Sequence, residues 1–124
     1  MKVTNLEIYK LFSDIKKSFE NNNSINLPIK INFFFIKNKN ILFKLYEEIE
    51  KARLDLLKRY AVIDNKTEEF YIPSESVQAV NKAINELFSI EQEVEIYKVK
   101  LKDFKEDLIL TTEQMEALMF MIEE

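Results

Sequence analysis

The N-terminal part of the chain carries apolar side chains at spacings of three and four residues, which is typical of an amphipathic helix. The stripe consists of Ile8, Phe12, Ile15 and Phe19. Thr4 and Glu7 have the spacing of a capping box, in which each side chain accepts a hydrogen bond from the other residue's backbone N–H. The pattern therefore predicts a helix that begins at Thr4 and ends before the short polar residues 21–24.

Between residues 27 and 36, apolar side chains occupy every second position. The alternating residues are Leu27, Ile29, Ile31, Phe33 and Phe35. A period of two indicates a strand with one buried face, and Phe34 and Ile36 add apolar side chains to the other face near its end. We therefore expect a strand over 27–36, with Phe33 and Phe35 buried in the core.

A helical period follows from about Ile41 to Tyr60, the longest regular pattern in the chain. Its apolar stripe consists of Leu42, Leu45, Ile49, Ala52, Leu56 and Tyr60. Two pairs of opposite charge at a spacing of four, Glu47 with Lys51 and Asp55 with Arg59, favour the same helix.

A turn signal at 64–66 separates two short extended segments, 61–63 and 70–72, which predicts a hairpin. Pro73 and Ser74 then precede another helical stripe. This stripe consists of Val77, Val80, Ile84 and Leu87, with Phe88 beside it.

The C-terminal third predicts a strand and a short helix. β-branched residues alternate from Glu93 to Leu101, with a change of parity that a bulge would produce, and 108–110 is a connector. Thr111 and Gln114 form a second capping box. The apolar positions that follow it are Met115, Leu118, Met119 and Ile122.

These elements predict a single α+β domain over residues 1–124, in which a small antiparallel sheet packs against three to four helices, one of them long. The strands 27–36 and 93–101 are expected to pair in that sheet, with the helices over one of its faces.

The residue types that the sequence lacks exclude several kinds of catalytic and metal-binding site. The 124 residues include no Cys, His, Gly or Trp. Without Cys and His there is no disulfide framework, no thiolate nucleophile and neither the commonest metal ligand nor the commonest general base. Without Gly there is no phosphate-binding loop and no nucleophile elbow. We therefore expect no enzymatic activity, no bound metal and no cofactor.

Neither a targeting signal nor a membrane span is apparent. The longest apolar run, Phe33–Ile36, has four residues, far fewer than a bilayer-spanning helix needs, and charged residues interrupt the N-terminal segment. We expect a cytoplasmic protein.

Carboxylates are the remaining groups with catalytic potential. Glu91, Glu93 and Glu95 alternate along the predicted strand and therefore share a face, as the metal ligands of a Mg²⁺-dependent nuclease would. Lys98, however, falls on the opposite face from Glu95. An acidic row that protects an edge strand from unwanted pairing explains the pattern as well, so a nuclease stays an alternative.

Lysines and phenylalanines interleave between residues 30 and 44, as they do in surfaces that bind single-stranded nucleic acid. They are Lys30, Phe33, Phe34, Phe35, Lys37, Lys39, Phe43 and Lys44. We favour a core role for these aromatic rings, because the predicted strand would otherwise contribute nothing to the interior, and no arginine accompanies them.

The net charge of −4 is unevenly distributed. Residues 1–66 carry 13 basic and 8 acidic side chains, whereas residues 67–124 carry 5 basic and 14 acidic ones. If the acidic half forms one surface, it would complement a basic partner such as a nucleic-acid-binding host effector. The C-terminal methionines offer adaptable apolar contacts, although a core helix is the alternative. The candidate partner-binding residues are Glu91, Glu93, Glu95, Asp103, Glu106, Asp107, Met119 and Met121.

Three stretches carry a resemblance to known sequences. The first is the predicted strand that leads into Ile36–Asn38, with the long charged helix that follows and ends at Leu56–Tyr60. The others are the strand Glu93–Leu101 and the ending Leu110–Leu118 with Met121–Glu124. In these stretches the chain resembles a family of small uncharacterised proteins encoded in phages and prophages of low-GC Gram-positive bacteria. None of the stretches is a catalytic motif, so the resemblance implies a phage origin and no particular activity.

Phage origin without catalytic side chains predicts an accessory protein that acts by binding other proteins in the host cytosol. The sharper expectation is an inhibitor of a host defence system, such as an anti-CRISPR protein. The alternative is a phage tail or virion assembly factor, and a second alternative is a Mg²⁺-dependent nuclease or nucleic-acid-binding protein. Self-association stays open.

Overall fold

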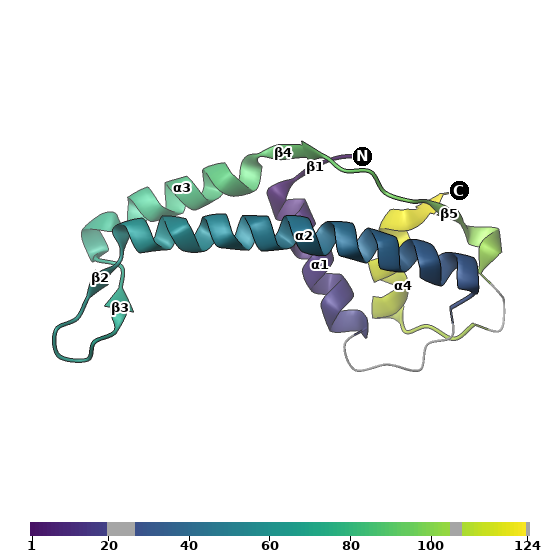
Figure 1. Cartoon of the computed structure of the whole chain (residues 1–124), viewed down its shortest axis with the longest axis horizontal. Helices are drawn as coiled ribbons and strands as arrows, with labels where there is room; N and C mark the ends of the chain where they lie inside the picture. The colour runs from purple at the N-terminus through teal and green to yellow at the C-terminus, as the bar shows by residue number, and fades with distance from the viewer. Residues whose placement is uncertain (20–26, 105–107, 124) are drawn as a thin grey trace.

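The computed structural model describes residues 1–19, 27–104 and 108–123, and the long helix α2 (Ile29–Tyr60) forms its axis (Figure 1). In this view α1 (Asn5–Phe19) passes behind the middle of α2 and α4 (Thr112–Leu118) behind its N-terminal half, whereas α3 (Val77–Ser89) runs along its C-terminal half. The predicted α+β class, with one long helix among four in the described residues, is confirmed.

The strands form three separate two-stranded sheets within the described part of the chain. The antiparallel pairs are β1 (Lys2–Thr4) with β4 (Glu91–Glu93) and β2 (Val62–Ile63) with β3 (Phe70–Tyr71); the parallel pair is β5 (Val99–Lys100) with β6 (Ile122–Glu123). The hairpin expected around the turn is therefore present. The pairing expected between 27–36 and 93–101 is wrong, because the first of these segments is helical.

Residues 29–36 form the first part of α2 and are not a strand, as Phe33 and Phe35 show. Phe35 is buried, with 7% of its surface exposed, whereas Phe33 is 55% exposed. In a strand both would share one face, but in a helix two residues two positions apart point in very different directions. The buried positions Ile31, Phe35, Asn38 and Leu42 have the helical spacing of four, three and four.

The predicted strand 93–101 is also interrupted. β4 ends at Glu93, residues 94–98 run extended without a strand partner, and β5 contains only Val99 and Lys100. The side chain of Asn38 takes the place of a neighbouring strand here. Its Nδ2 donates to the carbonyl of Tyr97 at 2.9 Å, and its Oδ1 accepts from the Tyr97 N–H at 2.8 Å.

The helix starts predicted from capping boxes are confirmed. The Glu7 N–H donates to Thr4 Oγ1 and the Thr4 N–H donates to Glu7 Oε1, both at 3.1 Å. At α4 the Gln114 N–H donates to Thr111 Oγ1 at 3.1 Å, and the Thr111 N–H donates to Gln114 Oε1 at 2.9 Å. The amide of Gln114, only 3% exposed, also donates to the carbonyl of Ser18, which fastens α4 to the last turn of α1.

The core lies where α1, the N-terminal half of α2 and the C-terminal segment meet. Its most deeply buried apolar side chains are Ile8, Ile15, Ile31, Leu42, Val99, Leu118 and Met121. The side of α2 that faces α1 and α4 is thus occupied, and the opposite side of the same helix is the one available to other molecules.

Candidate functional site

The uncovered side of α2 carries a row of exposed apolar side chains. Ile29, Phe33, Ile36 and Phe43 are 90%, 55%, 47% and 46% exposed. Their spacings of four, three and seven residues keep them in line along the helix, on the side opposite the buried positions 31, 35, 38 and 42. We call these four residues the α2 stripe. Phe43, at one end of the row, also packs on Phe12 of α1, with ring centroids 5.4 Å apart. A row of large apolar side chains that leave about half or more of their surface exposed is a candidate contact surface.

Lysines border the α2 stripe on both sides. Residues 29–46 include Lys30, Lys37, Lys39 and Lys44 but no acidic residue. At about 100° per residue, Lys30, Lys37 and Lys44 lie on one flank of the stripe and Lys39 lies on the other. The Nζ of Lys37 lies 5.2 Å from the ring centroid of Phe33 and 4.8 Å from that of Tyr97, so cation–π contacts hold it beside the stripe.

A groove of about 360 Å³ between α1 and α2 adjoins the stripe. Its apolar lining comes from Phe12, Ile15, Phe19 and Phe43, and its polar lining from Lys16, Lys39 and Asn40. Because Phe43 belongs both to the groove and to the α2 stripe, the two features form one continuous surface with an apolar centre and a basic border.

Two of the acidic residues predicted to bind a partner, Glu91 and Glu93, form ion pairs within the chain. Lys2 Nζ lies 3.0 Å from Glu91, and the N-terminal amino group lies 3.2 Å from Glu93. Both pairs link β1 to β4, so these carboxylates reinforce the sheet, while Glu95 is exposed on the extended segment that follows.

Asp103 lies at the far end of that extended segment from β4 (Figure 1), in a one-turn 3₁₀ helix (Leu101–Asp103). Its carboxylate accepts from the Lys100 N–H at 3.0 Å and pairs with Lys30 Nζ at 3.4 Å. These contacts, the backbone hydrogen bond foremost, hold the pKa of Asp103 below its ordinary value. Asp103 therefore lies apart from Glu91 and Glu93, and Glu106 and Asp107 lie outside the described residues.

The two methionines predicted to bind a partner differ in exposure. α4 ends at Leu118 and the chain continues as a 3₁₀ turn (Met119–Met121), which leaves Met119 58% exposed but Met121 fully buried. Met121 packs in the core with its sulfur 3.7 Å from Asn38 Nδ2. The assignment of Met121 to a partner surface is therefore corrected: it is a core residue.

The sequence pattern indicated the lysines of this region but not the α2 stripe, because the alternation over residues 27–36 predicted a strand in place of a helix. The signal that could have found the stripe is the heptad spacing of positions 29, 33, 36 and 43, which a helix places in one line. Of the four phenylalanines, the structure buries Phe35, half-buries Phe34 and leaves Phe33 and Phe43 exposed.

Within residues 1–19, 27–104 and 108–123, no three or more acidic side chains gather closely enough to hold a metal ion. In those same residues, no helix combines the length and the apolar character needed to cross a bilayer.

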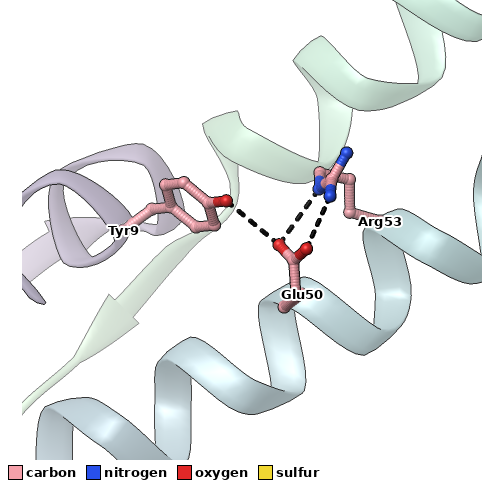
Figure 2. Close-up of polar contacts among 3 residues, drawn as sticks. All are labelled: Tyr9, Glu50 and Arg53. Atoms are coloured by element: carbon pink, nitrogen blue, oxygen red, sulfur yellow. Dashed lines mark hydrogen bonds and ion pairs between the residues drawn. The ribbon is translucent and has the colours of Figure 1, made fainter. Parts of the chain in front are cut away.

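A polar network joins α1 to α2 near the groove between these helices (Figure 2). The Tyr9 hydroxyl on α1 donates to Glu50 Oε2 at 3.1 Å, and Arg53 donates to both oxygens of the same carboxylate, through Nε at 3.0 Å and through its terminal nitrogen. The ring of Tyr9 also packs on Tyr46 and Phe88, with centroids 4.7 and 5.4 Å away.

The environment of the network shifts the pKa of all three groups; that of Arg53 is raised, chiefly by its hydrogen bonds to Glu50. Hydrogen bonding from Arg53, and then from Tyr9, lowers the pKa of Glu50 below its ordinary value of 4.5. The Tyr46 hydroxyl, burial and the Glu50 carboxylate raise the pKa of Tyr9 to about 12. The network is thus assembled when Glu50 is ionised and Tyr9 is protonated, as at neutral pH.

The lowered pKa of Glu50 predicts a loss of stability in acid. A carboxyl whose pKa is lower in the folded state stabilises the fold above its unfolded pKa, and this contribution disappears as pH falls through the folded value. We expect Glu50→Gln to have a smaller drop in melting temperature than the wild type between about pH 6 and about pH 3. The exposed Glu48→Gln serves as the matched control and should follow the wild type. Parallel melting curves for Glu50→Gln and the wild type would contradict the prediction.

The comparisons with known proteins add no relative. No family model, curated protein or solved structure matches this chain. A functional proposal therefore rests on the surface described above.

Proposed function

We propose that this protein acts by binding another protein through the α2 stripe and the adjoining groove, without chemistry of its own. The observation that carries the proposal is the α2 stripe: four large apolar residues lie exposed in line on a helix whose opposite side is the core. Apolar rows bordered by charged side chains are typical of protein–protein contact surfaces.

The biological setting that we propose follows from the resemblance to phage and prophage proteins. We place this protein in the host cytosol, where it would bind and inhibit an effector of a host defence system, CRISPR or another. A role in tail or virion assembly would use the same kind of surface, with a phage protein as the partner.

A second candidate, binding of single-stranded nucleic acid, is supported by the exposure of Phe33 and Phe43 beside lysines. Bases would stack on these rings. Ile29 and Ile36 have no aromatic face to offer, and the two exposed phenylalanines are ten residues apart, about 15 Å along the helix. An apolar row that combines aliphatic and aromatic side chains fits a protein partner better than separate bases.

Quantitative affinity purification from infected or lysogenic cells tests the proposal. The wild type, Phe33→Asp and Asn81→Asp are compared as baits. Both variants add one negative charge at an exposed helical position, and Asn81, on α3, belongs neither to the α2 stripe nor to the groove. We expect the wild type and Asn81→Asp to enrich the same protein to the same extent. Phe33→Asp should recover at least about tenfold less of it, because central apolar anchors dominate interface energies. Equal recovery by all three baits would refute the proposal.

The counter-defence role has its own test. Expression of the wild type in a CRISPR-active Gram-positive host should restore transformation by a plasmid that the host targets, and Phe33→Asp should lose this effect while Asn81→Asp keeps it. Recovery of tail or capsid proteins in the purification, with no rescue of the plasmid, would favour virion assembly instead.

A further inference from the structure

We infer that the partner of the α2 stripe is an amphipathic helix with acidic residues on both sides of its apolar face. This inference rests on the proposed function and adds the chemistry of the partner. It draws on three features of the surface: its heptad spacing, its lysine borders and the groove beside it.

The spacing of the α2 stripe is that of one strand of a coiled coil. Positions 29, 33, 36 and 43 fit alternating d and a sites of a heptad, with the exposed Asn40 at the a site between the last two. From Ile29 to Phe43 the row extends about 20 Å, roughly four helical turns. A straight apolar row of this length and period matches the apolar face of another helix, as in helix-in-groove recognition.

The lysines select the charge of that helix. With Phe33 at an a site, Lys30, Lys37 and Lys44 occupy e sites and Lys39 a g site, the positions that decide coiled-coil pairing. Among the described contacts, only Lys30 has an acidic partner, Asp103. The nearest acidic residue along α2 is Glu47, beyond the end of the stripe. A partner helix with Glu or Asp on its flanks would pair with these cations.

The same charges disfavour a second copy of this chain as the occupant. In a parallel pair, Lys39 of one chain would lie opposite Lys44 of the other, and in an antiparallel pair e sites would face e sites, lysine against lysine. Like charges at these positions oppose association. The surface is therefore suited to a different protein of opposite charge.

The groove between α1 and α2 provides an anchor point at one end of the row. A bulky apolar side chain of the partner can enter the groove and contact Phe19 and Phe43, and Lys16 and Lys39, which also line it, can pair with an acidic residue beside that side chain. Anchors of this kind, buried in a pocket and surrounded by polar contacts, carry most of the binding energy in interfaces.

Two synthetic peptides of about three heptads test the inference. Both have Leu at the a and d sites; one has Glu at every e and g site and the other has Lys there. Affinity is measured by fluorescence anisotropy with the full-length protein. We expect the Glu peptide to bind about tenfold tighter than the Lys peptide, and this preference to shrink between about 50 mM and about 500 mM salt, because screening weakens exposed charge pairs.

Charge reversal gives the decisive control. The double variant Lys37→Glu/Lys44→Glu should prefer the Lys peptide, whereas Lys51→Glu/Lys58→Glu, which changes two exposed lysines of the same helix beyond the stripe, should keep the wild-type preference. Equal affinity of the wild type for both peptides, failure to bind either, or an unchanged preference after reversal at 37 and 44 would overturn the inference.

Other occupants of the stripe give different results. If the protein sediments as a dimer and Phe33→Asp makes it monomeric, the occupant is a second copy of this chain. If the protein binds oligo-dT, Phe33→Asp abolishes that binding and the Glu peptide does not compete with it, the occupant is a nucleic acid. Either result overturns the inference. If the peptides fail while Phe33→Asp still loses its protein partner in the purification, protein binding stands and the acidic helix falls. If Phe33→Asp loses nothing there, the α2 stripe is not the interface and both proposals fall.

Discussion

Replacement of Phe35 by alanine is expected to lower the free energy of unfolding by about 3–5 kcal/mol, because it removes a buried ring and leaves a cavity against α1. The ring of Phe35 packs on Phe19, with centroids 4.9 Å apart, and is 7% exposed. Phe33→Ala, two residues away, is expected to change the free energy of unfolding by about 0.5 kcal/mol or less, because its ring is 55% exposed.

Urea denaturation of the two variants measures this difference, provided that both unfold with the wild-type dependence on denaturant. The pair also tests the helix itself. Large and equal losses for Phe33→Ala and Phe35→Ala would place both rings on one buried face, as in a strand, and would remove the α2 stripe on which the proposed function depends.

Asn38→Leu is expected to lower the free energy of unfolding by about 2–4 kcal/mol, although leucine is the better helix former. Asn38 is fully buried, and its amide satisfies both the N–H and the carbonyl of Tyr97. An apolar side chain of similar size would leave these two backbone groups without partners, and each unsatisfied buried group costs about 1–3 kcal/mol.

Asn32→Leu makes the same change at an exposed position of α2 and should leave stability close to that of the wild type. Hydrogen exchange provides a site-specific measurement: the Tyr97 amide should lose protection in Asn38→Leu, because that amide donates to Asn38 Oδ1. Full stability of Asn38→Leu, with the Tyr97 amide still protected, would show that the extended segment is held by something other than Asn38.

The candidate site could be predicted only in part. The sequence showed that lysines and phenylalanines interleave over residues 30–44, and that Glu91, Glu93 and Glu95 alternate. It did not show that Phe33 faces solvent, or that Glu91 and Glu93 pair with Lys2 and the N-terminal amino group. Ion pairs between residues about 90 positions apart depend on how whole helices and strands are arranged, and local sequence patterns do not reveal that arrangement.

The sequence by itself determined the elements whose cause is local. The two capping boxes each join residues three positions apart, and the strands of the hairpin at 62–71 are joined by a short turn. The apolar stripes of α1 and of the second half of α2 fit only the helical period. Tertiary structure decided the segment 29–36, since an apolar residue at nearly every position fits either period. Continuity with the helix that follows, and the packing of Ile31 and Phe35 into the core, selected the helix. Tertiary structure alone also gave Asn38 its role, because a buried amide acquires its partners only when distant backbone is brought against it.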